Sequence, residues 1–178
     1  MQFETIHPYL DGNGRLGRLL ITMLLEHWGL LKQPLLYLSL YFKRHRAEYY
    51  RRLGAVRSDG DWEGWTSFFL EGVATIADEA VATSRDLFAL VNKDRGRILG
   101  ARSATIASAR LFDELPKHPV VTMPGVVKLL AVTKPTAAKA IAVLQGLGVL
   151  EEITGRRRDR AFSYKAYVRR LREGTDLK

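Results

Sequence analysis

Cysteine is absent from the 178-residue chain, so it can form no disulfide, catalytic thiol or cysteine-ligated zinc site. Long apolar runs are absent as well. The longest, residues 19–25, is far shorter than the roughly 20 residues that a membrane-spanning helix needs. The N-terminal residues also lack the basic and apolar segments of a secretory signal. We therefore expect a cytoplasmic protein without a membrane partner, whose chemistry comes from other residue types.

Acidic side chains are scarce in the C-terminal part of the chain. Residues 101–178 contain 15 Lys and Arg against 7 Asp and Glu, whereas residues 1–100 contain 13 and 12. Nearly all of the net charge of +9 therefore lies after residue 100. Such an uneven distribution predicts two units with different partners.

Glycines and arginines open an amphipathic helix that the apolar spacing predicts over residues 13–28. Gly12 and Gly14 lack Cβ atoms, so the backbone N–H groups at the helix start can approach a bound phosphate. Arg15 and Arg18 lie three residues apart and project to one side of the helix. Their planar guanidinium groups can clamp several phosphate oxygens.

A histidine and an aspartate stand in the loop before this helix. Asp11 is a hard oxygen ligand, which suits Mg²⁺ held jointly with phosphates. His7 titrates near neutrality and can take a proton from an incoming hydroxyl. A phosphate cradle, a metal ligand and a base together indicate nucleotidyl transfer.

Other interpretations of the same residues were weighed. Residues 12–17 also match G-x-G-x-x-G, but a dinucleotide fold needs a preceding strand and an acidic residue about 20 positions later. Pro8 interrupts the short run before the loop, and no Asp or Glu lies between Glu26 and Glu48. A P-loop would need Lys after the second glycine. A helix capped by Asp11 or Asn13, with solvated arginines, remains open.

The twelve residues H-P-Y-L-D-G-N-G-R-L-G-R at positions 7–18 resemble the signature of the Fic family, H-P-F-x-D-G-N-G-R-x-x-R. Every defining position matches, with Tyr9 in place of Phe. The resemblance implies a mostly helical fold and an enzyme that moves AMP from ATP to a Ser, Thr or Tyr hydroxyl of a target protein. It assigns the base to His7, the Mg²⁺ ligand to Asp11 and the terminal-phosphate contact to Arg18. It assigns the phosphate hole to Gly12, Asn13, Gly14 and Arg15.

The Fic resemblance covers residues 1–92. Fic domains usually have several helices and a β-hairpin flap before the signature, which here begins at His7. We therefore expect the C-terminal half of a Fic-type helical bundle, truncated at the N-terminus. Residues 93–117 are expected to form a linker or connecting helix, and the glycines at 96 and 100 mark the boundary.

Two further helices are predicted between the signature and the linker. The first spans residues 35–53 after a turn at Pro34, and the second begins near Trp62 and continues through Ala89 or beyond. His45 and Glu48 form H-x-x-E on the first of them, but no third metal ligand is evident. A separate helix is predicted over residues 98–115.

Residues 118–178 resemble a winged helix-turn-helix domain with a small β-wing. Thr122 can cap a helix over residues 123–131, and Thr133 can cap a second one over residues 134–145. Strands are predicted at 147–153 and 160–164, joined by a basic turn.

This C-terminal domain supports a rival function, that of a non-catalytic regulator that binds DNA or forms homodimers. Phosphate contacts are expected from basic and hydroxyl side chains on the second helix and the wing. These are Lys134, Thr136, Lys139, Arg156, Arg157, Arg158 and Arg160. The second helix offers few groups that read bases, so sequence-specific binding is less favoured.

Overall fold

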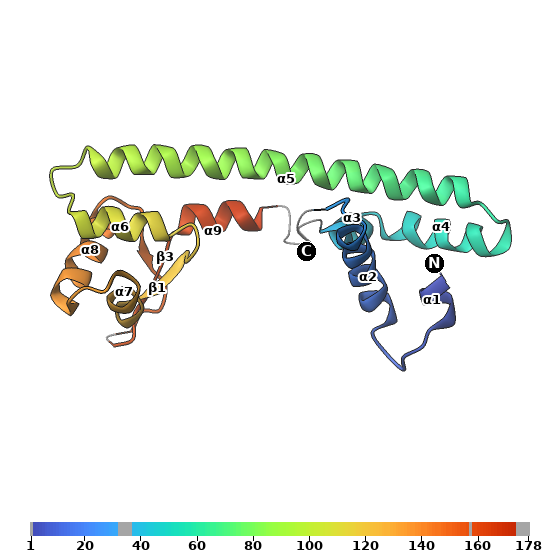
Figure 1. Ribbon diagram of the computed structural model, residues 1–178, viewed down its shortest axis with the longest axis horizontal. Coiled ribbons are helices and arrows are strands. Elements are labelled where there is room, and N and C mark those ends of the chain that lie inside the picture. The colour runs from blue at the N-terminus through green and yellow to red at the C-terminus, as the bar shows by residue number, and fades with distance from the viewer. Residues whose placement is uncertain (1, 32–36, 157, 174–178) are drawn as a thin grey trace. The chain divides into compact units, whose positions relative to one another are not determined.

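The computed structural model describes residues 2–31, 37–156 and 158–173 (Figure 1). The chain is mostly helical, with one small antiparallel sheet. It divides into two compact units, residues 1–82 and residues 83–176. Within the described residues no helix is both long and apolar enough to cross a membrane.

The first unit is made of helices only. Its elements are α1 (Gln2–Ile6), α2 (Asn13–His27), α3 (Leu38–Arg44), α4 (Arg46–Ser58) and the first part of α5 (Trp62–Leu99). Aromatic rings form the centre of its core: Phe42 lies 4.8 Å from Tyr49 and 6.0 Å from Phe68, measured between ring centroids. Helix α2 confirms the prediction from apolar spacing.

The single helix predicted over residues 35–53 is wrong. The structure has two helices, α3 and α4, which meet at His45 with φ −108° and ψ 39°. The imidazole packs 4.4 Å from the buried ring of Tyr41, centroid to centroid. The break between the helices thus coincides with an aromatic contact, and the apolar spacing along the sequence does not mark it. The predicted turn at Pro34 lies outside the described residues.

Helix α5 continues through residues 93–99 of the polar stretch, for which either a linker or a connecting helix was expected. Asp94 in that stretch is buried, accepting hydrogen bonds from the hydroxyl of Tyr164 at 2.7 Å and from Arg97 at 2.8 Å. Burial and the neighbouring carboxylate raise the pKa of Tyr164 above its ordinary value. The partner hydroxyl of Tyr164 is 70 residues away in the sequence, so local polarity could not choose between a linker and a connecting helix.

The helix predicted over residues 98–115 is also interrupted. α5 ends at Leu99, and α6 (Ile106–Glu114) begins only after Thr105. Thr105 and Ser108 form a reciprocal capping box, in which each side chain accepts a hydrogen bond from the other's backbone N–H. The cap satisfies helix N–H groups that would otherwise lack partners, and so defines a new helix start.

In its described residues the second unit combines the last part of α5 and four further helices with a three-stranded sheet (Figure 1). After α6 come β1 (Val120–Thr122), α7 (Met123–Leu130), α8 (Lys134–Gly146), β2 (Glu151–Glu152), β3 (Ala161–Ser163) and α9 (Lys165–Arg172). The strand order is β1-β3-β2, and both pairings are antiparallel. Leu111 of α6, Val126 of α7 and Leu144 of α8 are fully buried between these helices.

Local signals predicted α7 and α8 well, but not all of the sheet. Thr122 accepts a hydrogen bond from the backbone N–H of Gly125 at 3.2 Å, as a helix cap should. The predicted strand over 147–153 is reduced to β2, because residues 149 and 150 instead donate to the carbonyl of Leu144 at the end of α8. Strand β1 was not predicted, since three residues carry too little periodicity.

Candidate functional site

The loop before α2 reaches the helix through glycine. Gly12 is the residue before the first helical position and has φ +82°, a left-handed conformation that strains any residue with a Cβ. His7 at the other end of the loop also has a positive φ, of 52°. The two ends therefore bend sharply and bring the loop back over the start of α2.

Asn13 holds this loop in place. Its side chain is 2% exposed and makes two hydrogen bonds to the backbone of Tyr9: Oδ1 accepts from the N–H at 3.0 Å, and Nδ2 donates to the carbonyl at 2.6 Å. The side chain is thus committed to the loop. What Asn13 can offer a phosphate is its backbone N–H at the helix start.

Gly14 lies close to the guanidinium group of Arg18. A Cβ at this residue would lie 3.3 Å from Nη1 of Arg18, and a Cβ at Gly12 would lie 3.6 Å from Nη2 of Arg15. Both guanidinium groups therefore lie along the first turn of α2, beside the free backbone N–H groups. Cationic side chains and helix N–H donors are both features that favour a bound anion.

Asp11 lies at the exposed edge of this cradle. Its side chain is 93% exposed, accepting from the backbone N–H of Gly12 at 2.6 Å and pairing with Arg15 at 3.4 Å. No group of three or more metal-ligating side chains occurs in the described part of the chain. One exposed carboxylate is too little for an all-protein metal cage, but it fits Mg²⁺, which is commonly held by one or two carboxylates together with substrate phosphates.

Two adjoining cavities open between α2 and the helices α3 and α4. The first, the histidine cavity, has a volume of about 600 Å³ and is lined by His7, Gly14 and Arg18 on one side. Its other side comes from α4 and includes Tyr49 and Tyr50. The structure thus brings the predicted base and two predicted phosphate contacts, Gly14 and Arg18, to the same cavity.

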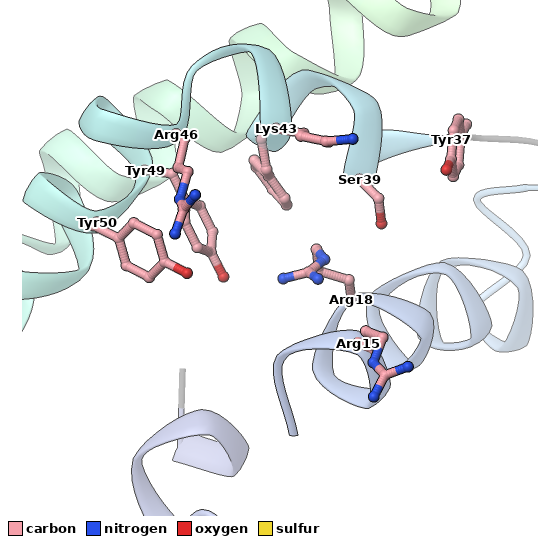
Figure 2. A pocket seen from close by; sticks show the side chains of 9 residues that line it. Arg15, Arg18, Tyr37, Ser39, Lys43, Arg46, Tyr49 and Tyr50 are labelled. Carbon is pink, nitrogen blue, oxygen red and sulfur yellow. The ribbon is translucent and has the colours of Figure 1, made fainter. Parts of the chain in front are cut away.

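The second, the arginine cavity, has a volume of about 410 Å³ and shares Arg18 and the two tyrosines with the first (Figure 2). Its lining residues are Arg15, Arg18, Tyr37, Ser39, Phe42, Lys43, Arg46, Tyr49 and Tyr50. Four of them are cationic and none is acidic, within the part of the chain that the structure describes. Such a lining favours an anionic ligand with several charges.

The two arginines of the signature differ in direction. Figure 2 shows Arg18 extending from α2 toward the side chains of α3 and α4, whereas Arg15 points away from them. Arg15 instead pairs with Asp11, and its side chain is largely exposed. The spacing predicted that both side chains project to one side of α2. In the structure Arg18 is the inner one, facing α3 and α4, and Arg15 is the outer one, facing away from them.

Lys43 and Arg46 were not among the residues that the sequence predicted for the site. Both line the arginine cavity, and the guanidinium of Arg46 lies 5.7 Å from the centre of the Tyr50 ring. The available signal was the spacing of Lys43, Arg46 and Tyr50, three and four residues apart. That spacing alone does not reveal which element faces them.

The H-x-x-E pair does not form a metal site. Glu48 accepts hydrogen bonds from Arg51 at 2.6 and 2.7 Å and from Arg52 at 2.6 Å. The two arginines, Arg51 first, lower the pKa of Glu48 from 4.5 to about 2. Glu48 is therefore an ion-pair partner, and His45 packs against Tyr41.

The predicted nucleic-acid contacts lie in the second unit. Lys134, Thr136 and Lys139 are exposed along α8, and Thr136 shares a hydrogen bond of 2.9 Å with Thr133. Arg156 and Arg158 are exposed between β2 and β3, and Arg157 lies outside the described residues.

Arg160 is the member of this set with an ionic partner. It pairs with Glu152 at 3.0 Å, and its guanidinium lies 5.2 Å from the centre of the Phe162 ring. The pKa of Glu152 is lowered, first by the hydrogen bond that it accepts from the hydroxyl of Thr154 and then by Arg160. Arg160 therefore contributes less free positive charge than its neighbours.

Comparison with protein families gives one result for this region. Residues 1–25 match the model of the Fic/DOC family. The match includes the whole loop from His7 to Gly12, the cradle at the start of α2, and α2 as far as Leu25.

Proposed function

We propose that this chain, whose residues 1–25 are Fic/DOC family sequence, is a Mg²⁺-dependent nucleotidyltransferase that moves AMP from ATP to a hydroxyl side chain of a protein. The observation that supports this most directly is the histidine cavity. It places His7, Gly14 and Arg18 around one space large enough for a reacting phosphate group and an incoming hydroxyl.

The phosphates of ATP would bind at the start of α2. Backbone N–H groups of Asn13 and Gly14 are donors at a helix N-terminus, where the helix dipole favours negative charge. Arg18 points into the cavities and would hold the innermost phosphate oxygens, while Arg15 would close the outer side. Lys43 and Arg46 add charge to the opposite wall.

Asp11 would hold Mg²⁺ from the exposed edge of the cradle, jointly with phosphate oxygens. The ion would neutralise part of the phosphate charge when bound. Before that happens, Arg15 must give up a contact of 3.4 Å, which is long and exposed and therefore weak.

His7 would act as the base of the transfer. The hydroxyl oxygen of the target forms a bond to the α-phosphorus of ATP, and the bond from that phosphorus to the bridging oxygen breaks. Pyrophosphate leaves with the electron pair, and the hydroxyl proton passes to the imidazole of His7. General-base catalysis of this kind contributes roughly 10²–10⁴-fold in rate.

The test uses ATP labelled at the α-phosphate, with Mg²⁺, the chain and a cell lysate. We expect labelled protein with the parent chain, none with His7→Ala, and strongly reduced label and ATP binding with Arg18→Ala. His118→Ala is the matched control, because His118 is an exposed histidine in the second unit. Equal labelling by the parent and His7→Ala would reject the proposal.

A second candidate is DNA binding by the second unit, in a cytoplasmic regulator. The order α6, β1, α7, α8, β2, β3 with an antiparallel β1-β3-β2 sheet supports a winged helix-turn-helix. Lys134, Lys139, Arg156 and Arg158 would contact phosphates, so the logarithm of the affinity should fall with the logarithm of salt with a slope of about −3.6. Lys134→Ala should reduce that slope by about one. Affinity that does not change with salt would reject this candidate.

A further inference from the structure

A groove lies between helix α9 and the outer face of the sheet, and all of its residues belong to the second unit. Val121 of β1 and Phe162 of β3 pair across the sheet and are buried in the core. Their neighbours Val120 and Ser163 therefore lie on the opposite face, because successive side chains of a strand alternate. The cavity on this face has a volume of about 500 Å³, which suits a small organic ligand. It is referred to below as the α9 groove.

Apolar side chains form much of the surface of the α9 groove. Val120 and Ile153, the residue after β2, line it from the sheet and are 49% and 54% exposed. Val168 lines it from α9. The backbone N–H of Ile153 donates to the carbonyl of Ala161 at 3.0 Å, so this residue is held against β3. A ligand body that covers these side chains would be stabilised by the removal of apolar surface from water.

The α9 groove also contains a hydroxyl group without a protein partner. Ser163 is 5% exposed and lines the groove, and its side chain makes no hydrogen bond to any residue in the part of the chain that the structure describes. No fully enclosed side-chain oxygen of these residues lacks a partner, so the access that this hydroxyl keeps is through the groove. A nearly buried hydroxyl of this kind gains a hydrogen bond when a ligand oxygen reaches it.

One face of α9 supplies positive charge to the groove. Lys165, Arg169 and Arg172 line it at spacings of four and three residues, so they project to the same side of the helix as Val168. Lys165 pairs with Glu151 of β2 at 2.7 Å. Arg169 has no ion-pair partner among residues 2–31, 37–156 and 158–173. Its charge is therefore available to an anion in the groove.

The acidic residue at the end of the groove does not cancel this charge. Glu173 lines the groove, but it pairs with Arg170, which is not a lining residue. The charge presented to a ligand is thus positive. An arginine binds a carboxylate through two parallel hydrogen bonds, so Arg169 matches a ligand with one carboxylate. The apolar remainder of the surface matches a ligand whose other atoms are uncharged.

We propose that the α9 groove is a binding site for a small organic acid with one carboxylate and an apolar body. The carboxylate accepts hydrogen bonds from the hydroxyl of Ser163 and from Arg169. The apolar body lies over Val120, Ile153 and Val168. This site is separate from the loop and cavities of the first unit, and it does not depend on the transfer reaction proposed for them.

Titration of the full chain with octanoate, followed by NMR of the backbone amides, tests the site. We expect saturable shifts at Val120, Ser163 and Val168, and an affinity that rises from hexanoate to octanoate by up to about fourfold for each added CH₂. Octyltrimethylammonium and 1-octanol have the same alkyl chain without the negative charge and should bind more weakly. Equal affinity for octanoate and octyltrimethylammonium would overturn the proposal, and so would the absence of saturable shifts at these three amides.

Two variants test the carboxylate contacts. Arg169→Gln should weaken octanoate binding about two- to fivefold, as for the loss of an exposed ion pair, and should not change binding of 1-octanol. Ser163→Ala should weaken octanoate binding about two- to tenfold. Arg102→Gln is the matched control, because Arg102 is an exposed arginine of the same unit that does not line the groove. Equal octanoate affinities of Arg169→Gln and Arg102→Gln would overturn the proposal. A dimer of the parent chain that Val168→Asp converts to a monomer in sedimentation would assign the groove to a second copy instead.

Discussion

Replacing Asn13 by alanine should loosen the signature loop while leaving the helices intact. The asparagine side chain is buried and makes two hydrogen bonds to the backbone of Tyr9, at 3.0 and 2.6 Å. Alanine keeps the backbone and the helix propensity of α2 but removes both bonds. The loop from His7 to Gly12 would then be held less firmly, since the positive φ of His7 does not itself favour the observed conformation.

The size of the effect follows from these two bonds. Each is worth about 0.5–1.5 kcal/mol, so their loss costs roughly 1–3 kcal/mol. Since 1.4 kcal/mol corresponds to a factor of ten, opening of the loop should become about 5- to 150-fold more frequent. The side chain of Tyr9 is more than half exposed, so water can replace part of the lost bonding and the lower half of this range is expected.

Hydrogen exchange at the amide of Tyr9 measures the effect without reference to function. Its protection should fall by the same factor, while amides in the middle of α4 keep theirs. Transfer of labelled AMP by the same variant should fall by no more than that factor, because only the fraction of closed loops changes. Asn92→Ala is the matched control, because Asn92 is an exposed asparagine of α5.

One result would refute the reasoning. If the Tyr9 amide exchanges equally fast in Asn13→Ala, in Asn92→Ala and in the parent chain, the side chain of Asn13 does not hold the loop. A fall in protection without any change in transfer would leave the loop clamp intact as a structural device but separate it from the proposed chemistry.

Three further predictions concern the packing and electrostatics. Tyr164→Phe removes the bond from a buried hydroxyl to Asp94 and should lower the free energy of unfolding by about 1–3 kcal/mol in urea titration; an unchanged midpoint would contradict the buried pair. Gly72→Ala would place a Cβ 2.6 Å from Cδ1 of buried Tyr41 and should destabilise by about 1–3 kcal/mol, whereas Gly96→Ala meets nothing within 4 Å and should stabilise by up to about 1 kcal/mol. Because the pKa of Glu48 is lowered from 4.5 to about 2, its stabilising effect should be complete above pH 4.5 and disappear as the pH falls toward 2. The difference in unfolding free energy between the parent and Glu48→Gln should follow that course, and a difference that does not change with pH would contradict it.

The helices that local signals define were predicted from sequence, and those that tertiary contacts define were not. The apolar spacing of residues 16–24 was enough for α2, and Thr122 and Pro124 were enough for the start of α7. The apolar spacing gave no sign of the break at His45, and the hydroxyl that accompanies the burial of Asp94 in α5 comes from Tyr164, 70 residues later. A single sequence carries no record of which distant side chain will arrive at a given position.

The sequence by itself determined the chemistry available to this protein. It excludes thiols, and it places an imidazole, a carboxylate, three glycines and two guanidinium groups within twelve residues of a segment that matches the Fic/DOC family model. The tertiary structure decided how these groups are used. It commits the side chain of Asn13 to the loop, turns Arg18 inward and Arg15 outward, and adds Lys43 and Arg46 from other helices. The physical reason is that residue type and spacing along one helix fix what a side chain can do, whereas the direction it faces and its partners depend on which helices pack against it.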